Sequence, residues 1–172
     1  MPESEAVRLA ILHAIGILDT PPDERYDRLV ALASSLTGMP MANLSLVDQD
    51  RQWFKARVGI PVASTPRNIS FCQYTILNPE TLLVEDATQD ARFADSPLVA
   101  GDDGVRFYAG TPISVMGENL GALCVLDTKP NSLTVSQLQA LRMLADVAAL
   151  MLHADFVERC CTHPQAGSMA VR

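Results

Sequence analysis

Apolar side chains in the first forty residues recur at the three- and four-residue spacing of two amphipathic helices. The first helix begins after the cap residue Ser4 and stops at Gly16. The second takes Pro22 as its first helical residue and ends before Gly38, which suits the left-handed position after a helix. We therefore predict that two helices open the chain, each burying one face.

Beyond Pro40 the period of the apolar positions changes from helical spacing to two, which is typical of strands. Apolar and polar residues alternate on both sides of the polar triplet 48–50, which predicts a β-hairpin, and a second turn is predicted at 117–119. Five strands are expected, at 42–47, 51–56, 82–85, 105–116 and 120–127.

The connections 61–69 and 85–104 are rich in Pro, Gly, Asp and Thr, and their length favours a functional role. A short helix is predicted between them, at 71–77. Alternation along the fourth strand places Val105 on an apolar face that packs on helices and Tyr108 on the opposite face. We expect an α+β fold, in which terminal helices cover one face of an antiparallel sheet of five to six strands, and loops and short helices cover the other.

The last helix is predicted over 134–158, where Thr134 and Gln137 stand at capping-box spacing. It carries two apolar stripes, and since one partner requires only one stripe, we predict a homodimer through the terminal helices. The predicted dimer face consists of Leu138, Leu141, Ala145, Ala148 and Leu152, and the second stripe of Leu144, Val147, Met151 and Ala154. The chain is expected to form a single domain over 1–158, with a core at about 6–155 and a flexible tail at 159–172.

Composition limits the classes of function. The 172 residues are 48% hydrophobic and 19% charged, which is typical of one globular domain. Thirteen basic residues against 20 acidic ones give a net charge of -7, which disfavours nucleic acid and anionic membranes as partners. The pattern predicts neither a signal peptide nor a membrane span, and four cysteines without CxxC spacing favour free thiols, so we expect a cytoplasmic protein.

Six segments stand out by their length and order: LDTPPDERYDRL, SLVDQDRQWFKARVGI, TPRNISFCQYTI, VEDATQDARFADSPLV, VRFYAGTPI and LGALCVLD. Together they resemble a bacterial GAF domain of the kind that precedes histidine kinases and cyclic-di-GMP enzymes. The resemblance runs over about residues 6–155. It implies a PAS-related sheet with a ligand pocket under its loops, and a non-catalytic sensory or regulatory role in two-component or cyclic-di-GMP signalling, with an output domain or protein as partner.

The departures from this resemblance bear on the cofactor. Cyclic GMP is disfavoured because the Asn-Lys-Phe-Asp-Glu pattern of GAF domains that bind it is reduced here to DARFAD. A bilin is disfavoured because Gln73 and Tyr74 follow Cys72 where bilin-binding relatives place a histidine. Haem is disfavoured because Tyr74 stands where many relatives carry histidine. The cofactor therefore stays unknown.

A small-molecule site is predicted on the looped face, for a planar or mildly anionic metabolite. Its expected ligand-binding residues are Asn43, Ser45, Phe71, Cys72, Tyr74, Phe93, Leu98, Arg106 and Tyr108. Arg67, Asp86 and Arg92 are expected to form a salt-bridge network in the loops or to clamp an anion. No catalytic residues and no metal are expected, since Cys160, Cys161 and His163 lack further ligands at usable spacing.

Two alternatives remain open at the level of sequence. The chain resembles in size the free methionine sulfoxide reductases, GAF proteins that use cysteines in the pocket, although their cysteine pattern differs from the surroundings of Cys72 and Cys124. The other alternative is a purely structural dimerisation module whose pocket is filled by its own side chains.

Overall fold

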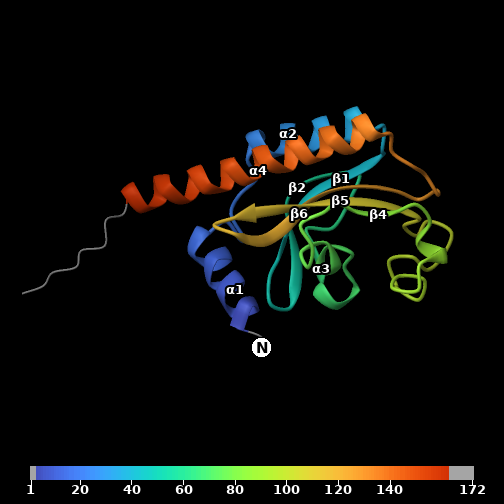
Figure 1. Cartoon of the computed structure of the whole chain (residues 1–172), viewed down its shortest axis with the longest axis horizontal. Coiled ribbons are helices and arrows are strands. Elements are labelled where there is room, and N and C mark those ends of the chain that lie inside the picture. The colour runs from blue at the N-terminus through green and yellow to red at the C-terminus, as the bar shows by residue number, and fades with distance from the viewer. Residues whose placement is uncertain (1–2, 163–172) are drawn as a thin grey trace, which may run out of the picture.

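The structure, a computed structural model, describes residues 3–162 and is built on one antiparallel sheet of six strands in the order β3-β2-β1-β6-β5-β4 (Figure 1). The strands are β1 (Met41–Val47), β2 (Arg51–Val58), β3 (Ser64–Pro66), β4 (Leu82–Val84), β5 (Phe107–Val115) and β6 (Glu118–Asp127). The helices are α1 (Glu3–Ile15), α2 (Glu24–Thr37), α3 (Cys72–Thr75) and α4 (Val135–Thr162), with short 3-10 turns η1 (Arg67–Ile69) and η2 (Ala87–Gln89). The predicted α+β fold is confirmed.

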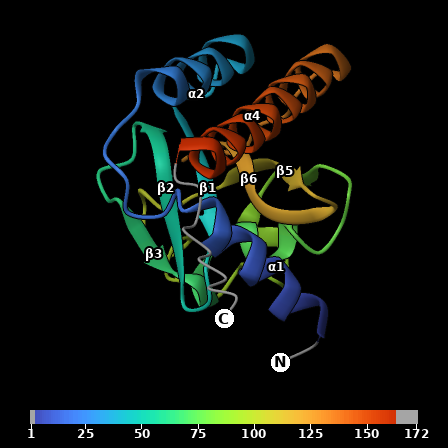
Figure 2. The same ribbon diagram turned by 90° about the vertical axis from the view of Figure 1, so that its left-hand side faces the viewer.

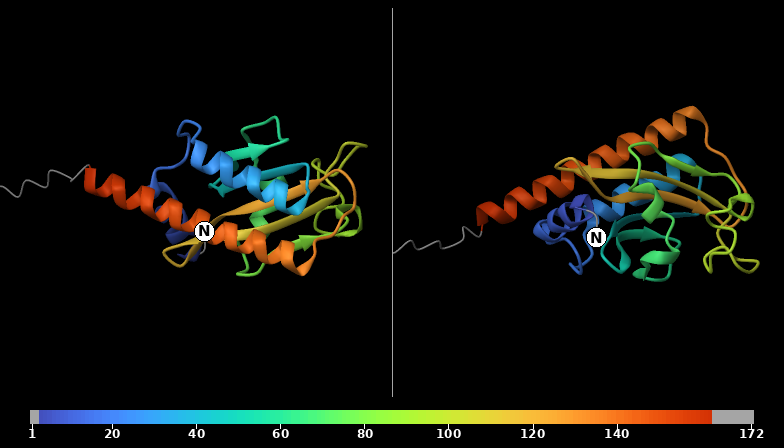
Figure 3. Two further views of the ribbon diagram at one scale, coloured as in Figure 1. Left: turned by 90° about the horizontal axis from the view of Figure 1, so that it is seen from above. Right: turned by 60° about the horizontal axis from the view of Figure 1, so that its bottom comes forward.

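Helices α2 and α4 lie side by side across one face of the sheet, and α3 with the long loops covers the other (Figures 2 and 3). Helix α1 packs on β6 and on α4 at one end of the sheet. Helix α4 extends past the sheet at its C-terminal end (Figure 1). Among residues 3–162, none of the helices combines the length and apolar character that a membrane crossing requires.

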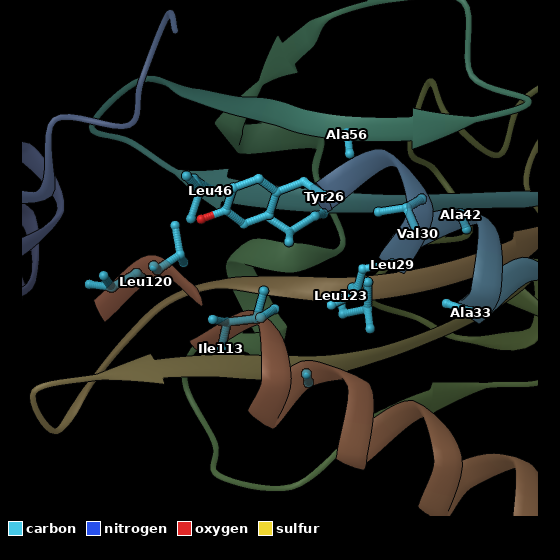
Figure 4. Packing of buried hydrophobic residues seen from close by; sticks show 14 of the residues in the cluster. Tyr26, Leu29, Val30, Ala33, Ala42, Leu46, Ala56, Ile113, Leu120 and Leu123 are labelled. Carbon is cyan, nitrogen blue, oxygen red and sulfur yellow. The ribbon is translucent and has the colours of Figure 1, made fainter. Parts of the chain in front are cut away.

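The core on the helix side is centred on Tyr26, which is fully buried (Figure 4). Leu29 and Val30 follow it on α2 and pack in the same cluster as Leu46 and Leu123 of the sheet. The helical spacing of the apolar residues therefore gives the stripe that α2 buries. Asp23 caps the N-terminus of α2, so Pro22 precedes the cap and is not the first helical residue as predicted.

The turns between strands depart from the prediction at two places. Strands β5 and β6 meet at Met116 and Gly117, both at positive φ, so the turn has two residues and not the predicted 117–119. A short strand, β3, lies within the connection predicted to be irregular and pairs with β2. Val105 lies before β5 and packs with the cluster on the loop side, not on the predicted helix side.

Helix α4 begins at the predicted capping box, in which the backbone N–H of Gln137 donates to Thr134 Oγ1 and the N–H of Thr134 donates to Gln137 Oε1. The helix continues to Thr162, past the predicted end at 158, and the rest of the predicted tail, 163–172, lies outside the described residues. The predicted dimer face is corrected, because its residues pack inside the protomer. Leu138 is half-buried, and the others are at most 1% exposed: Leu141, Ala145, Ala148 and Leu152.

Helix α1 is attached to the sheet through an ionic cluster around Glu5. Its carboxylate accepts two hydrogen bonds from Arg8, at 2.7 and 2.8 Å, and a third from Arg67 at 2.7 Å. Arg8 also donates to the carbonyl of Val47 at the end of β1. The hydrogen bonds from Arg8 lower the pKa of Glu5 to about 2, aided by Arg67 and opposed by burial.

Substitution of Glu5 by glutamine is expected to lower the stability at pH 7 by about 2–3 kcal/mol, and most of this effect is expected to be lost near pH 2. Because the pKa of Glu5 is lower in the folded than in the unfolded protein, its contribution is complete above pH 5 and is lost as the pH falls toward 2. Denaturant unfolding at a series of pH values measures this. Glu80→Gln is the matched control, because its carboxylate pairs with Arg142 at a side-chain exposure of 77%. A constant difference between Glu5→Gln and wild type across this pH range would contradict the assignment.

Candidate functional site

A pocket of about 380 Å³ lies on the loop-covered face of the sheet, between the floor formed by β1, β2 and β6 and the loops that follow β2 and precede β5. Its size is within the range of small-molecule sites. The residues that line it are Met41, Asn43, Gln52, Phe54, Gly59, Ile60, Pro61, Val62, Thr65, Phe71, Cys72, Pro97, Leu98, Ala100, Asp103, Gly104, Val105, Tyr108 and Leu126.

The floor of the pocket follows from strand register. In the β1–β2 pair the register shifts by one residue just before Ser45, which then lies opposite Phe54. Because side chains alternate along a strand, Asn43 and Ser45 share one face of β1, and Gln52 and Phe54 share the same face of β2. Three of these four line the pocket; Ser45 is fully buried beneath it.

Two buried amide oxygens at this pocket have no hydrogen-bond partner among the described residues: Asn43 Oδ1 and Gln52 Oε1. Their residues are 3% and 5% exposed, and both line the pocket. The other end of the Gln52 amide makes a long bond of 3.4 Å to Thr65. Buried polar atoms are normally paired, and each unpaired one costs about 1–3 kcal/mol. The pocket therefore contains two polar groups that the protein itself leaves unsatisfied.

The pocket was expected to hold a mildly anionic ligand through Arg106, but its lining carries a negative charge. Among the described lining residues, Asp103 is the single charged side chain. Arg106, predicted to contact the ligand, instead donates at 2.6 Å to each of the carbonyls of Val99 and Gly101. It fixes the loop at the pocket rim, and Gly104 allows this close packing, since an added Cβ would lie 2.2 Å from the Val99 oxygen. The assignment of Arg106 to the ligand site is corrected, because its guanidinium is occupied by the backbone.

Aromatic rings form one wall of the pocket. Phe71 lines it and stacks on Tyr108 at 4.9 Å and on Phe93 at 4.2 Å between ring centroids. Phe93 lies behind Phe71, away from the pocket, and Tyr74 contacts the edge of Phe93 at 5.1 Å. The prediction that Tyr74 and Phe93 line this pocket is wrong, because both residues instead line a separate pocket of about 260 Å³ together with Arg92.

Of the nine predicted ligand-binding residues, the structure places five at the pocket: Asn43, Phe71, Cys72, Leu98 and Tyr108. The residues that sequence reasoning missed include Gln52, Phe54 and Asp103. Strand alternation carried a signal for the first two, because a core position for Trp53 requires its neighbours to face the opposite side. Asp103 carried no such signal, since its loop has no periodic pattern.

The predicted ionic group does not come together. Arg67 pairs with Glu5 on α1, Arg92 pairs with Asp90 at 2.6 Å, and the carboxylate of Asp86 accepts from the backbone N–H of Thr88. The contacts of Arg92 and Asp86 are local to their loop, whereas that of Arg67 reaches helix α1, so the three side chains have separate partners. These contacts agree with the salt-bridge alternative for Arg67 and Arg92, and they leave no shared clamp for an anion.

Two thiols and three hydroxyls form a buried cluster that extends from the pocket wall, at Cys72 and Tyr108, into the protein. Cys72 Sγ lies 3.2 Å from Cys124 Sγ and 3.3 Å from the Tyr108 hydroxyl, which is 3.2 Å from Cys124 Sγ. The Ser45 hydroxyl lies 3.1 Å from Cys72 Sγ, and the Thr75 hydroxyl 2.7 Å from that of Tyr108. Burial raises the pKa of Cys124 and of Tyr108 well above their ordinary values.

Comparison with known proteins agrees with this architecture. A family model described as GAF domain matches residues 21–152. A curated relative from Pseudomonas aeruginosa, "Cyclic di-GMP phosphodiesterase PA2567", is 44% identical over 130 residues, which are 75% of this chain and 22% of the relative. The chain therefore spans about a fifth of the length of that relative.

Two solved structures have the same fold at low sequence identity. The GAF domain of an Acinetobacter phosphoenolpyruvate-protein phosphotransferase matches with a TM-score of 0.65 and 18% identity, over 89% of this chain and 98% of that one. The free methionine-R-sulfoxide reductase of Neisseria meningitidis, solved in complex with its substrate, matches with a TM-score of 0.64 and 16% identity, over 92% and 95%.

Proposed function

Because the chain belongs to the GAF domain family, we propose that it is a sensory module that binds a small, uncharged or cationic molecule in the pocket over β1 and β2. The relative named as a cyclic di-GMP phosphodiesterase supports a regulatory role in cyclic-di-GMP signalling. Binding would move the loop that Arg106 holds at the pocket rim, and would shift the population of conformers in which sheet and α4 pack differently.

The unpaired oxygens of Asn43 and Gln52 carry this proposal. A fold that filled the pocket with its own side chains, as in the purely structural alternative, would have no reason to retain two buried amides without partners. A ligand that donates N–H or O–H groups to them offsets their desolvation. The surrounding walls are largely apolar, and Phe54, Phe71 and Tyr108 contribute aromatic surface to them.

The charge of the lining supports binding of a neutral or cationic molecule, and not the mildly anionic one first expected. Asp103 favours a positive charge at the rim, and the described lining residues include no cation. Free methionine sulfoxide is a zwitterion whose carboxylate requires a cation or several N–H donors. We therefore favour a non-catalytic sensor over the reductase, although the two thiols of the buried cluster keep the reductase a defined alternative.

Substitution of Asn43 by leucine is expected to stabilise the ligand-free protein and to abolish ligand binding. Removing an unpaired buried amide is worth about 1 kcal/mol, which corresponds to a rise in melting temperature of about 2–4 °C. A thermal-shift screen of wild type and variant measures both effects, with neutral amides, nucleobases and amines as compounds and free methionine sulfoxide as the zwitterionic comparison. Native mass spectrometry of the purified wild type identifies a ligand that copurifies.

The matched control is Asn119→Leu, because the Asn119 amide donates to the carbonyls of Ile76 and Asn78 at 3.0 and 3.2 Å. This variant is expected to melt at a lower temperature and to keep the ligand response. The proposal is wrong if Asn43→Leu is destabilised like Asn119→Leu and no compound stabilises wild type selectively. Conversion of methionine sulfoxide to methionine would favour the reductase.

We also propose that a second copy of the chain pairs along an exposed seam of α4, in place of the corrected dimer face. Met143, Val147, Leu150 and Val157 are 68%, 44%, 71% and 45% exposed. With Ala140 and Ala154 they follow alternating steps of three and four residues, which is the repeat of a two-stranded coiled coil. Such a seam is self-complementary, so an identical helix is the partner that fits it. Helix α4 extends beyond the sheet, which gives the partner helix access (Figure 1).

A further inference from the structure

The two buried cysteines sit on elements of different rigidity. Cys124 lies in the middle of β6, which is hydrogen-bonded on both sides by β1 and β5. Cys72 begins the four-residue helix α3, which is flanked by loops. Their sulfurs are 3.2 Å apart, so a disulfide of about 2.05 Å requires an approach of roughly 1.1 Å. A small shift of α3 towards the sheet supplies it.

The two thiols differ in access. Cys72 lines the pocket, whereas Cys124 is fully buried behind it. A small oxidant that enters the pocket therefore meets Cys72 first. No side chain separates the two sulfurs at this distance, so an oxidised Cys72 stands directly in front of a second thiol.

The surroundings of the two sulfurs shift the pKa values of the two thiols in opposite directions. Burial opposes ionisation of Cys72, but hydrogen bonds from Cys124, Ser45 and Tyr108 stabilise its thiolate, and the pKa of Cys72 is lowered. Burial and the hydrogen bond to Cys72 raise the pKa of Cys124 well above its usual value. Cys72 is thus the nucleophile towards the oxidant. Cys124 keeps its proton until Cys72 beside it has been oxidised to a sulfenic acid.

We propose that Cys72 is a site of oxidation by small peroxides that enter through the pocket, and that Cys124 resolves the product to an internal disulfide. The Cys72 thiolate attacks one peroxide oxygen, the O–O bond breaks, and the leaving oxygen takes up a proton to become water when the oxidant is hydrogen peroxide. Cys124 then attacks the sulfenic sulfur of Cys72, the S–O bond breaks, and the hydroxyl leaves as water with the Cys124 proton. Two thiols and one peroxide give one disulfide and two waters.

The disulfide would join the floor of the sheet to α3 and alter the wall that Phe71 forms next to Cys72. Oxidation would thereby change the shape of the ligand pocket. The chemistry itself requires no pocket ligand, so it stands or falls independently of the proposed sensory function.

The test uses the full chain with Cys160→Ser and Cys161→Ser, which removes the two exposed thiols. The reduced protein is treated with equimolar hydrogen peroxide, alkylated under denaturing conditions, and analysed by intact mass and peptide mapping. We expect Cys72 and Cys124 to be lost together, as a disulfide linking their two peptides. Adding Cys124→Ala should leave Cys72 as a sulfenic or more oxidised acid, and adding Cys72→Ala should leave Cys124 reduced.

The route of entry is tested by Leu98→Trp in the same background, because Leu98 lines the pocket and makes no hydrogen bond to either thiol through its side chain. The larger indole side chain should slow the oxidation of Cys72 several-fold, while near-UV circular dichroism shows that the variant is folded. The proposal is overturned if both thiols stay reduced at a peroxide dose that oxidises Cys160 and Cys161 in the wild-type chain. It is also overturned if Cys124 reacts in the absence of Cys72. The peptide map of the double-serine protein decides the question alone if an alanine variant does not fold.

Discussion

Asp155→Ala is expected to lower the free energy of unfolding by about 3 kcal/mol and the melting temperature by about 6–12 °C. The Asp155 carboxylate accepts from the Tyr26 hydroxyl at 2.8 Å and from Arg25 at 2.9 and 3.2 Å. Tyr26 is fully buried, so the variant leaves its hydroxyl without an acceptor in the core. Burial and the hydrogen bond to Asp155 raise the pKa of Tyr26, which keeps the phenol as the donor.

A double-mutant cycle separates this bond from other effects of the substitution. Tyr26→Phe in the Asp155→Ala background removes both partners and should recover part of the loss, with a coupling energy of about 1–2 kcal/mol. Asp146→Ala is the matched control, because Asp146 is exposed on the same helix, and it should change stability by less than about 0.5 kcal/mol. Equal effects of Asp155→Ala and Asp146→Ala would contradict the role given to the contact.

The elements of this fold were predictable wherever a local signal coincides with the tertiary arrangement. Helix α2 ends before Gly38, whose φ of 72° is the left-handed conformation expected there, whereas its start was predicted two residues too early, at Pro22 and not after the cap Asp23. The capping box at Thr134 fixes the start of α4. Strand β3 was missed because its three residues, with an exposed, intermediate and exposed pattern, bury no face that periodicity detects.

The candidate site was predictable only in part, because two kinds of information are absent from the sequence. The alternation of residues places Asn43 and Tyr108 on the looped face, but it does not show that Phe93 lines a separate pocket. The charge of Arg106 suggested an anion site, but the carbonyls that occupy it belong to a loop without periodic pattern. Periodicity identifies apolar faces, and the identity of what covers them depends on the whole fold.

Helix α4 also has more apolar surface than the periodic pattern can assign. One apolar face packs on the protomer's own sheet and α2, and a second is exposed. The stripe around Leu141 and Leu152 is buried on the protomer's own sheet and α2, and the contact of Asp155 with Tyr26 holds the helix in that rotation. The exposed seam therefore points away from the core.

The second stripe predicted from the sequence differs from this seam, because Leu144 and Met151 pack against the core while Val147 and Ala154 are exposed. Helical spacing alone does not show which residues of α4 stay exposed.

Leu150→Glu is expected to weaken self-association by at least about 100-fold and to leave the protomer folded. Leu150 is 71% exposed in the protomer, so the charge is solvated there, but in the paired seam each glutamate would be buried against the partner helix. The cost of desolvating these charges amounts to about 3 kcal/mol or more, and each 1.4 kcal/mol is a factor of about ten. Sedimentation equilibrium of wild type and variant over micromolar concentrations measures the change.

Two control variants distinguish the seam from the protomer core. Leu77→Glu carries the same substitution at a residue that is also 71% exposed but lies outside α4, and it should remain dimeric. Leu141→Glu places the charge at a residue with no exposed surface, so it should lower the melting temperature strongly by disrupting the protomer itself. A monomeric wild type, or a Leu150→Glu variant that associates like wild type, would remove the seam as the interface. Dissociation by Leu141→Glu without loss of stability would instead restore the face first predicted from the sequence, because only a residue free in the protomer can accept a charge without cost to the fold.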